Sequence, residues 1–422
     1  MKLNKLFILL IVFFFQGTLQ EFGLPTVIFK VLSEGVLVIG MLPFLLKLQL
    51  KKDEVKLLFV VGLYVIWAIL SAVYNDQNFY YAFAYTRYTI LGMMLFFVAS
   101  RLKFNKDNCK YIFYALVGVA VLQIVASLVN SGFLSQAVER KVGTLGNTGG
   151  VLATVFTIFI MPFFLYYYLK VKNIYYLILS LSTLIIGIAS GKRAVIFYFL
   201  ILSVITIFKS QKNKLNPFKV ILPVVLILIS VNIAILNVSS GVIDGVFEDF
   251  TGNYGEATTY AIEYSTGLDT RSNATGRIGA SQNIITNISD KNNIDRLFFG
   301  YGPSTLMGEM IFRPFNIVYG IVGWGMDVIS VGLPALVIYC IIIYILWRRV
   351  KRIKTTNDRY FNALLIGTRM AFITWFIAHF TYSGIYVKGP IPVLIFMALC
   401  GFLIGHSKFI NNNLFLLENN ER

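Results

Sequence analysis

The chain has 422 residues, of which 57% are hydrophobic and only 14% are charged, and its mean hydropathy is +0.73. This composition excludes an ordinary soluble globular protein and predicts a polytopic membrane protein. In a soluble chain the formal net charge of +17 would suggest nucleic-acid binding, but here it is the excess of Lys and Arg expected in cytoplasmic loops. The three cysteines are far apart and predict neither a disulfide framework nor a cysteine-rich metal site.

Apolar runs long enough to cross about 30 Å of hydrocarbon predict an all-α protein with twelve transmembrane helices. The first run begins directly after Met1 and lacks a small-residue cleavage site, so we expect it to be retained as a helix and not removed as a signal peptide. In chain order the runs lie at 5–19, 25–46, 57–74, 88–100, 111–129, 148–169, 173–190, 194–208, 219–238, 316–346, 360–380 and 390–405.

Basic segments predict the direction in which these helices cross. When each run crosses once, the Lys- and Arg-rich segments fall on one side, which the positive-inside rule assigns to the cytoplasm together with both termini. These segments contain Lys2 and Lys5 and continue with 47–56, 101–110, 170–172, 209–219, 347–354 and the tail after His406. The opposite side then receives 74–87, 130–147, 190–193, 239–315 and 381–389.

The turn SGKR at 190–193 lies between two runs that must cross outward and return. At 1.5 Å per residue the returning run, 194–208, is about 22 Å long and therefore shorter than the hydrocarbon core. Arg193 is thus expected at membrane depth, where a charge needs a cavity or a partner and indicates a functional site. The alternative is an Arg193 side chain that extends to the outer headgroups.

Residues 239–315 form the one long polar stretch, and they predict a net acidic extracytoplasmic lobe or lid. Within it, the pattern of 275–289 predicts a helix with Arg277 near its N-terminus. The segment FFGYGPSTL at 298–306 predicts a Gly-Pro turn, and no Walker, Rossmann or HExxH pattern occurs in the chain. The predicted organisation is membrane helices at 1–238, the lobe at 239–315, and membrane helices with a cytoplasmic tail at 316–422.

Two other outer segments carry side chains suited to a ligand. Arg140 and Lys141 come just before a Gly-rich helix start whose backbone N–H groups could bind an anion. The segment 75–89 carries Tyr85 and Arg87 among several other tyrosines. Its aromatic rings could stack on sugars, and an interfacial aromatic belt explains them equally well.

The positive-inside rule disfavours cations on the outer side, so the cations expected there need an anionic partner. Guanidinium groups bind phosphate oxygens bidentately and stay charged, so several around one cavity suit a lipid pyrophosphate. A glycosyltransferase outside the cytoplasm has no nucleotide supply and must use a lipid-linked donor. Fixed cations could stabilise its pyrophosphate leaving group without a metal or another cofactor. The cations concerned are Arg87, Arg140, Lys141, Arg193 and Arg277.

An ordered set of short motifs resembles the O-antigen polymerase and O-antigen ligase superfamily, the Wzy-like membrane glycosyltransferases. The motifs are RKVGTLGN (140–147), SGKRA (190–194), TGR (275–277) and GYG (300–302), followed by DVISVGLPALVIY (327–339). The resemblance implies a helical GT-C-like fold in which Arg193 and Arg277 hold the undecaprenyl pyrophosphate. It also implies that a growing glycan is transferred to an acceptor hydroxyl.

The sequence departs from the ligases of this superfamily, which carry a histidine shortly after the GxG turn. Residues 303–327 contain no histidine, and this favours a polymerase. The general base is left open among Glu309, Asp327 and Asp249, any of which could accept the proton of the acceptor hydroxyl. His379 could also reach the cavity as a binding residue, or it could be a hydrogen-bonded intramembrane histidine.

The expected function is a metal-independent polymerase that joins undecaprenyl-pyrophosphate-linked repeat units at the outer face of a bacterial cytoplasmic membrane. Its expected partners are the lipid-linked donor and acceptor, membrane lipid and, as an open alternative, a chain-length regulator, but not nucleic acid. The alternatives are a ligase-type transferase to a lipid or protein acceptor, and a transporter of lipid-linked oligosaccharides. A transporter would be expected to show ionisable residues in many span centres and two similar halves, and the sequence shows no internal repeat.

Overall fold

The computed structural model describes most of the chain, and all regular secondary structure in its described ranges is helical. Apart from a few residues before position 11, the described residues are 26–105, 107–132, 143–144, 150–190, 194–210, 277–288, 294–306, 321–382 and 390–420. The expected run at 219–238 lies wholly outside these ranges, and the run at 5–19 lies mostly outside them.

Seven of the described helices are long and apolar enough to cross a membrane. They are α4 (Lys52–Tyr74), α5 (Phe79–Ala99), α6 (Asn108–Asn130), α7 (Gly150–Val171), α17 (Leu333–Arg352), α18 (Arg359–Thr381) and α20 (Pro390–Asn420). Shorter apolar helices are α3 (Thr26–Leu45), α8 (Ile174–Ser182) with α9 (Leu184–Ala189), and α10 (Ala194–Ser210). The helical membrane fold is therefore confirmed, whereas the count of twelve spans and the GT-C-like arrangement stay predictions.

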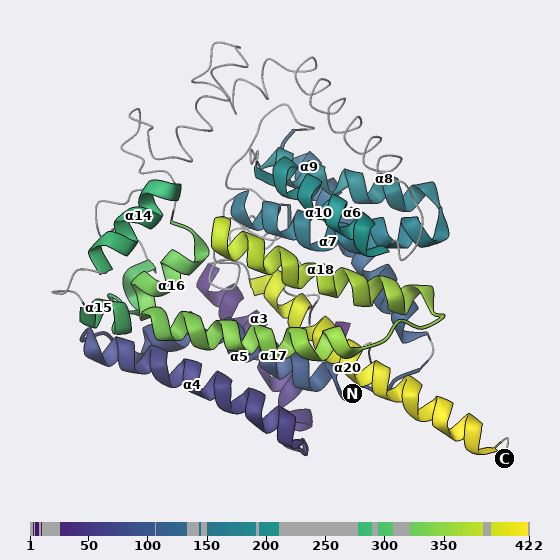
Figure 1. Cartoon of the computed structure of the whole chain (residues 1–422), viewed down its shortest axis with the longest axis horizontal. Coiled ribbons are helices and arrows are strands. Elements are labelled where there is room, and N and C mark those ends of the chain that lie inside the picture. Colours follow the sequence, from purple (N-terminus) through teal and green to yellow (C-terminus); the bar gives the residue numbers. More distant parts are fainter. Residues whose placement is uncertain are drawn as a thin grey trace, which may run out of the picture.

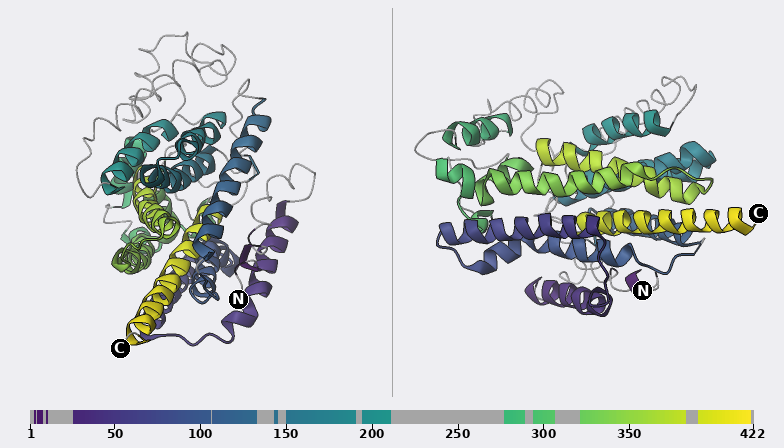
Figure 2. Two further views of the ribbon diagram at one scale, coloured as in Figure 1. Left: turned by 90° about the vertical axis from the view of Figure 1, so that its right-hand side faces the viewer. Right: turned by 60° about the horizontal axis from the view of Figure 1, so that its bottom comes forward.

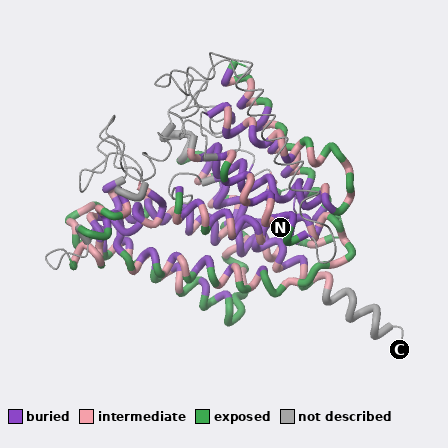
Figure 3. The backbone as a smooth tube through the Cα atoms, turned by 45° about the horizontal axis from the view of Figure 1, so that its top comes forward, coloured by how far each residue is buried: buried purple, intermediate pink, exposed green. Residues whose placement is uncertain are grey.

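The long helices lie side by side, with four short helices gathered at one end of the bundle (Figures 1 and 2). The short helices are α14 (Arg277–Ile288), α15 (Ile294–Phe299), the 3-10 helix η2 (Pro303–Leu306) and α16 (Gly323–Val331). Buried residues line the inner faces of the bundle, and exposed residues follow the outer faces of its peripheral helices (Figure 3).

Helix α7 supplies much of the core. Its side chains Phe156, Phe163 and Phe164 are fully buried, as expected for a helix that is apolar on every face. The hydroxyl of Thr374 in α18 donates to the carbonyl of Ile158 at 3.3 Å. Polar residues of neighbouring helices thus find partners on the α7 backbone, which membrane burial requires.

Two expected spans are interrupted. The run 173–190 divides into α8 and α9 at Thr183, whose carbonyl accepts a hydrogen bond from the Thr157 hydroxyl at 3.0 Å. The run 316–346 divides into α16 and α17 at Gly332, where φ is +85°. A Cβ atom at Gly332 would lie 1.9 Å from the carbonyl oxygen of Phe298, so only glycine fits this turn. A new helix then begins at Leu333, and Pro334 is tolerated in its first turn, where its missing N–H needs no partner.

Helix α5 begins earlier than the apolar run at 88–100 indicates. Its first residue is Phe79, and the Asn78 side chain caps it by accepting from the backbone N–H of Tyr80 at 2.8 Å. The 21 residues of α5 extend about 32 Å, which matches the hydrocarbon thickness. The expectation that 74–87 is an outer segment is therefore wrong for 79–87. Polar side chains there lower the mean hydropathy, so a hydropathy scan does not detect this part of the helix.

The last helix also continues beyond the expected end of its span at 405. Helix α20 runs to Asn420, because residues 406–420 contain neither glycine nor proline to end it. The segment expected as a cytoplasmic tail is thus a helical extension of the last span.

Segments predicted to share the cytoplasmic side meet at one end of the bundle. Arg101 forms an ion pair with Glu54 at 2.6 Å and donates to the carbonyl of Gln49 at 2.9 Å. Arg349 donates to the carbonyl of Asp53. These contacts join the predicted cytoplasmic segments 47–56, 101–110 and 347–354, as one shared side requires. Which membrane face they occupy stays a prediction.

Candidate functional site

Three residues singled out in the sequence meet at a buried carboxylate. The phenol of Tyr85 donates to Oδ1 of Asp327 at 2.5 Å, and Nε2 of His379 lies 3.3 Å from Oδ2. The three side chains come from α5, α16 and α18. Their exposed fractions are 2%, 2% and 0%. A buried carboxylate is stable only with such partners, so the fold brings these groups together specifically.

Aromatic side chains surround this cluster. The Trp375 ring stacks on the His379 imidazole with centroids 5.1 Å apart and an interplanar angle of 10°. Tyr339 lies 6.5 Å from the same imidazole and 5.6 Å from the Tyr64 ring, measured between centroids. The sequence analysis did not predict that these three aromatic residues belong to a site. The spacing of Trp375 and His379, four apart on one helix face, was the available signal for one of them.

The Asp327 and His379 side chains form an acid-base pair. A carboxylate facing one imidazole nitrogen fixes the ring orientation and stabilises its protonated form, and the other nitrogen can then exchange a proton. Water is kept from both groups, and this strengthens their electrostatic interaction. The Asp327 carboxylate therefore fixes the orientation of the His379 imidazole.

The TGR motif is joined to this cluster through helix packing. Arg277 is the first residue of α14, as the sequence predicted. From α14, Ala280 and Ile284 are buried against Ile329 and its neighbours in α16. A Cβ atom at Gly325 would lie 2.9 Å from Cδ1 of Ile284, so the glycine allows close contact between the helices. Arg277 and Asp327 thus belong to two helices that pack directly on one another.

The GYG motif forms the predicted turn beside α16. Gly300 and Gly302 have φ values of +64° and +93°, which favour glycine. The backbone N–H of Tyr301 donates to the carbonyl of Ile329 at 2.7 Å, and the Gln77 amide donates to the carbonyl of Tyr301 at 2.9 Å. The turn is therefore fixed to α16 and to the connection between α4 and α5.

Charged residues of α15 stabilise the same turn. The guanidinium of Arg296 lies 4.9 Å from the Tyr301 ring centroid and donates to the Asn75 side chain. The Tyr74 hydroxyl donates to Asp295 at 2.7 Å and lowers the pKa of this carboxyl. Burial raises the pKa of Tyr301, which therefore stays neutral around pH 7. Arg296, an arginine of the predicted outer loop, is thus bound by other side chains of the protein.

Two further motifs, RKVGTLGN and SGKR, lie next to helices that reach the end of the bundle where α14, α15 and α16 lie. In RKVGTLGN, Gly143 has a φ of +53° and Thr144 donates its N–H to the Gln123 side chain at 3.1 Å. Helix α10 follows the SGKR motif, and its Tyr198 hydroxyl lies 2.9 Å from the hydroxyl of Thr381, two residues after His379. The last turn of α18 therefore connects the His379 region to the helix that begins after SGKR.

Arg87, another of the predicted outer cations, contacts side chains of α3 and α5. Its Nε lies 3.7 Å from a Glu34 carboxylate oxygen, and its Nη2 donates to the Tyr88 hydroxyl at 2.7 Å. An anionic partner for Arg87 is therefore present inside the chain. The candidates Arg140, Lys141, Arg193, Asp249 and Glu309 lie outside the described residues, as does the side chain of Arg277. Within the described ranges, no group of three or more His, Cys, Asp or Glu side chains could hold a metal ion.

Compared with protein-family models, the chain matches none, and no curated protein matches it either. The resemblance to Wzy-like glycosyltransferases therefore depends on the ordered motifs. The structure adds that the GYG turn and the helix beginning with Arg277 both contact α16, the helix that carries Asp327.

Proposed function

We propose that this protein is a membrane polymerase that joins lipid-pyrophosphate-linked oligosaccharide units. One observation carries the proposal. The acid-base pair of Asp327 and His379 lies on helices that also hold the GYG turn and the helix beginning with Arg277. Glycosyl transfer from a lipid pyrophosphate needs both a proton acceptor and cations for the leaving group, and the motifs supply candidates for each.

In the proposed reaction, the acceptor hydroxyl attacks the anomeric carbon of the donor glycan. A new C–O bond forms, the bond from this carbon to the pyrophosphate oxygen breaks, and undecaprenyl pyrophosphate leaves. His379 takes the hydroxyl proton, with Asp327 holding the imidazole in position and Tyr85 holding Asp327. Arg193 and Arg277 stabilise the negative charge that develops on the pyrophosphate.

The role of His379 refines the expectation that a carboxylate acts alone as the base. The imidazole faces Asp327 with Nε2. In this proposal Nδ1 is therefore the nitrogen that takes the proton of the acceptor hydroxyl. Because the pair is buried, the acceptor must displace some of the surrounding aromatic side chains before it reacts. A site closed in this way excludes water, which would otherwise hydrolyse the donor.

The test uses the purified full-length protein in detergent with an undecaprenyl-pyrophosphate-linked repeat unit prepared from the host. Products are separated by size on a gel, with and without EDTA. A ladder of multiples in both conditions supports the polymerase. Transfer of a single unit to an added lipid or protein acceptor would indicate ligase-type activity. If no transfer occurs but lipid-linked units cross vesicle membranes, the protein is a transporter and the proposal is wrong.

A further inference from the structure

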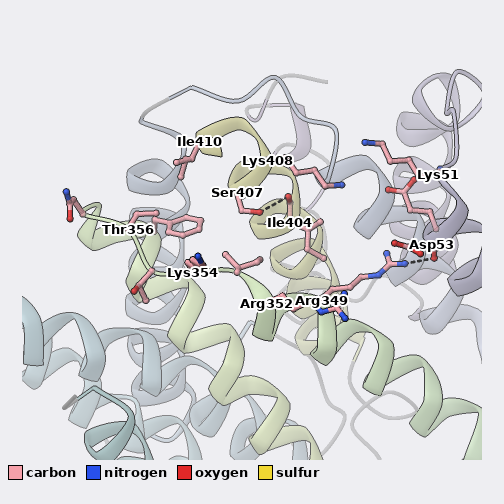
Figure 4. Close-up of a pocket in the computed structure, with 15 residues that line it drawn as sticks. Lys51, Asp53, Arg349, Arg352, Lys354, Thr356, Ile404, Ser407, Lys408 and Ile410 are labelled. Carbon is pink, nitrogen blue, oxygen red and sulfur yellow. Dashed lines mark hydrogen bonds between the residues drawn. The ribbon is translucent and has the colours of Figure 1, made fainter. Parts of the chain in front are cut away.

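A cavity lies at the opposite end of α17 from Asp327, where the predicted cytoplasmic segments meet. Its volume is about 810 Å³, within the range of small-molecule sites. It is bounded by the start of α4, the connection between α17 and α18, and the C-terminal half of α20 (Figure 4). Nothing in the proposed glycan transfer uses this cavity.

The lining carries an excess of positive charge. Five cationic side chains face two carboxylates, those of Asp53 and Glu54. Glu54 is already engaged, because it pairs with Arg101 at 2.6 Å and accepts from the backbone N–H of Lys51 at 2.9 Å. Arg101 itself is not part of the lining. The five lining cations are Lys51, Arg349, Arg352, Lys354 and Lys408, and among the described residues none of them forms an ion pair.

These cations come from three separate parts of the chain. Lys51 precedes α4, Arg349 and Arg352 end α17, and Lys408 belongs to α20. Like charges held together by a fold repel one another, and an anion bound between them relieves that repulsion. The guanidinium of Arg349 is anchored through its hydrogen bond to the Asp53 carbonyl (Figure 4), so at least one cation is held in place.

Apolar side chains also line the cavity, namely Ile353, Phe361, Ile404 and Ile410. A lining that combines cations with apolar side chains suits an amphipathic ligand with a phosphate group at its polar end. Basic pockets between transmembrane helices on the cytoplasmic side are suited to anionic lipid headgroups.

We propose that this cavity binds the phosphate group of an anionic ligand, held by Lys51, Arg349, Arg352 and Lys408. Phosphate oxygens match both the bidentate guanidinium fork and the ammonium point charge. The apolar lining residues favour a membrane lipid as the source of the phosphate, and a soluble polyphosphate offers the same chemistry. The proposal is independent of the glycan-transfer site, since the two lie at opposite ends of α17.

The test compares two double variants of the full-length protein in neutral detergent. Lys51→Gln with Arg352→Gln removes two lining cations. The matched control, Lys52→Gln with Lys351→Gln, removes two exposed cations that are adjacent in sequence and do not line the cavity. The unfolding temperature is followed during titration with phosphatidylglycerol, with phosphatidylcholine and with inorganic pyrophosphate, because a ligand that binds the folded state stabilises it in proportion to its occupancy.

Phosphatidylglycerol, but not phosphatidylcholine, should stabilise the wild type and the control. The lining variant should bind it roughly thirtyfold more weakly, since each Lys or Arg near a membrane surface contributes about fivefold. The same pattern with pyrophosphate alone supports the phosphate site with a soluble ligand. Equal responses of the lining variant and the control, or no stabilisation by either anionic ligand, overturn the proposal. Lys408→Gln, in α20, removes one of the four cations of the proposed site and gives a second variant should the double variant unfold.

Discussion

Tyr85 and His379 each contact a different oxygen of the Asp327 carboxylate, so each contact can be removed singly. The Tyr85 hydrogen bond is charge-assisted and fully buried, which places it among the stronger hydrogen bonds in proteins. Its loss leaves a buried carboxylate oxygen without a donor, and the cost of such a group exceeds the average value of a hydrogen bond.

Tyr85→Phe should therefore lower the free energy of unfolding by about 1–3 kcal/mol and reduce polymer formation by misplacing Asp327. The measurement is thermal unfolding in detergent together with the gel assay. Tyr80→Phe is the matched control, because Tyr80 lies on the same helix and is 66% exposed. Equal stability of both variants would contradict a structural role for the Tyr85 hydroxyl.

Arg193→Ala and Arg277→Ala should each abolish polymer formation while the protein still inserts into the membrane. Replacement with Lys should restore little activity, because an ammonium group lacks the bidentate fork. The assay is polymer size in cells, with protein amount in the membrane fraction as the check on insertion. Arg348→Ala at the other end of the bundle serves as the control, since this residue is exposed. Normal polymer in both Ala variants would disprove the pyrophosphate clamp.

At the scale of elements, docking of α14 on α16 links the TGR motif to the acid-base pair. The contact is made by Ile284 against Gly325, with Ala280 and Ile329 buried beside it. Both helices are short, so their relative position depends on this small apolar contact.

Gly325→Ala should displace α14 and lower activity, because the added Cβ would lie 2.9 Å from Ile284. Combining it with Ile284→Val should recover part of the loss by removing the methyl group in the way. The comparison is a double-mutant cycle on the rate of polymer formation. Gly62→Ala controls for glycine replacement, since nothing lies within 4 Å of its Cβ position. Strictly additive effects of the two changes would argue against the contact.

Local signals predicted some elements and not others. The helix beginning at Arg277 and the GYG turn follow from a capping pattern and from glycines that adopt positive φ. The start of α5 does not follow from hydropathy, because its first half carries Arg87 and several tyrosines, which lower the mean hydropathy of this stretch. The interruption at Gly332 depends on the approach of Phe298, which no local pattern encodes.

At the scale of the whole molecule, basic segments and the Asp327 cluster lie apart along the bundle. The basic lining of the cavity lies at one end, and α14, α15 and α16 lie at the other (Figure 1). Charge along the sequence predicted which segments share a side. It could not predict that residues 85, 327 and 379 converge, because their contact depends on how three helices pack.

The predicted orientation can be checked by labelling single cysteines in intact cells with a membrane-impermeant maleimide. Asp76→Cys, in the connection between α4 and α5, should be labelled from outside, and Lys354→Cys should be labelled only after the membrane is permeabilised. Both positions are exposed, so access to the reagent decides the result. The wild type, with its three cysteines, gives the background. Labelling of Lys354→Cys in intact cells would reverse the assigned topology.

The most direct test of the central claim is the formation of polymer by purified Asp327→Asn protein beside the wild type. Asn has the same shape but lacks the charge that stabilises a protonated His379. Asp107→Asn, which changes an exposed carboxylate, is the control. The account predicts a ladder of repeat-unit multiples from the wild type and the control, unaffected by EDTA, and unpolymerised units from Asp327→Asn. A ladder of equal length and rate from Asp327→Asn would contradict it.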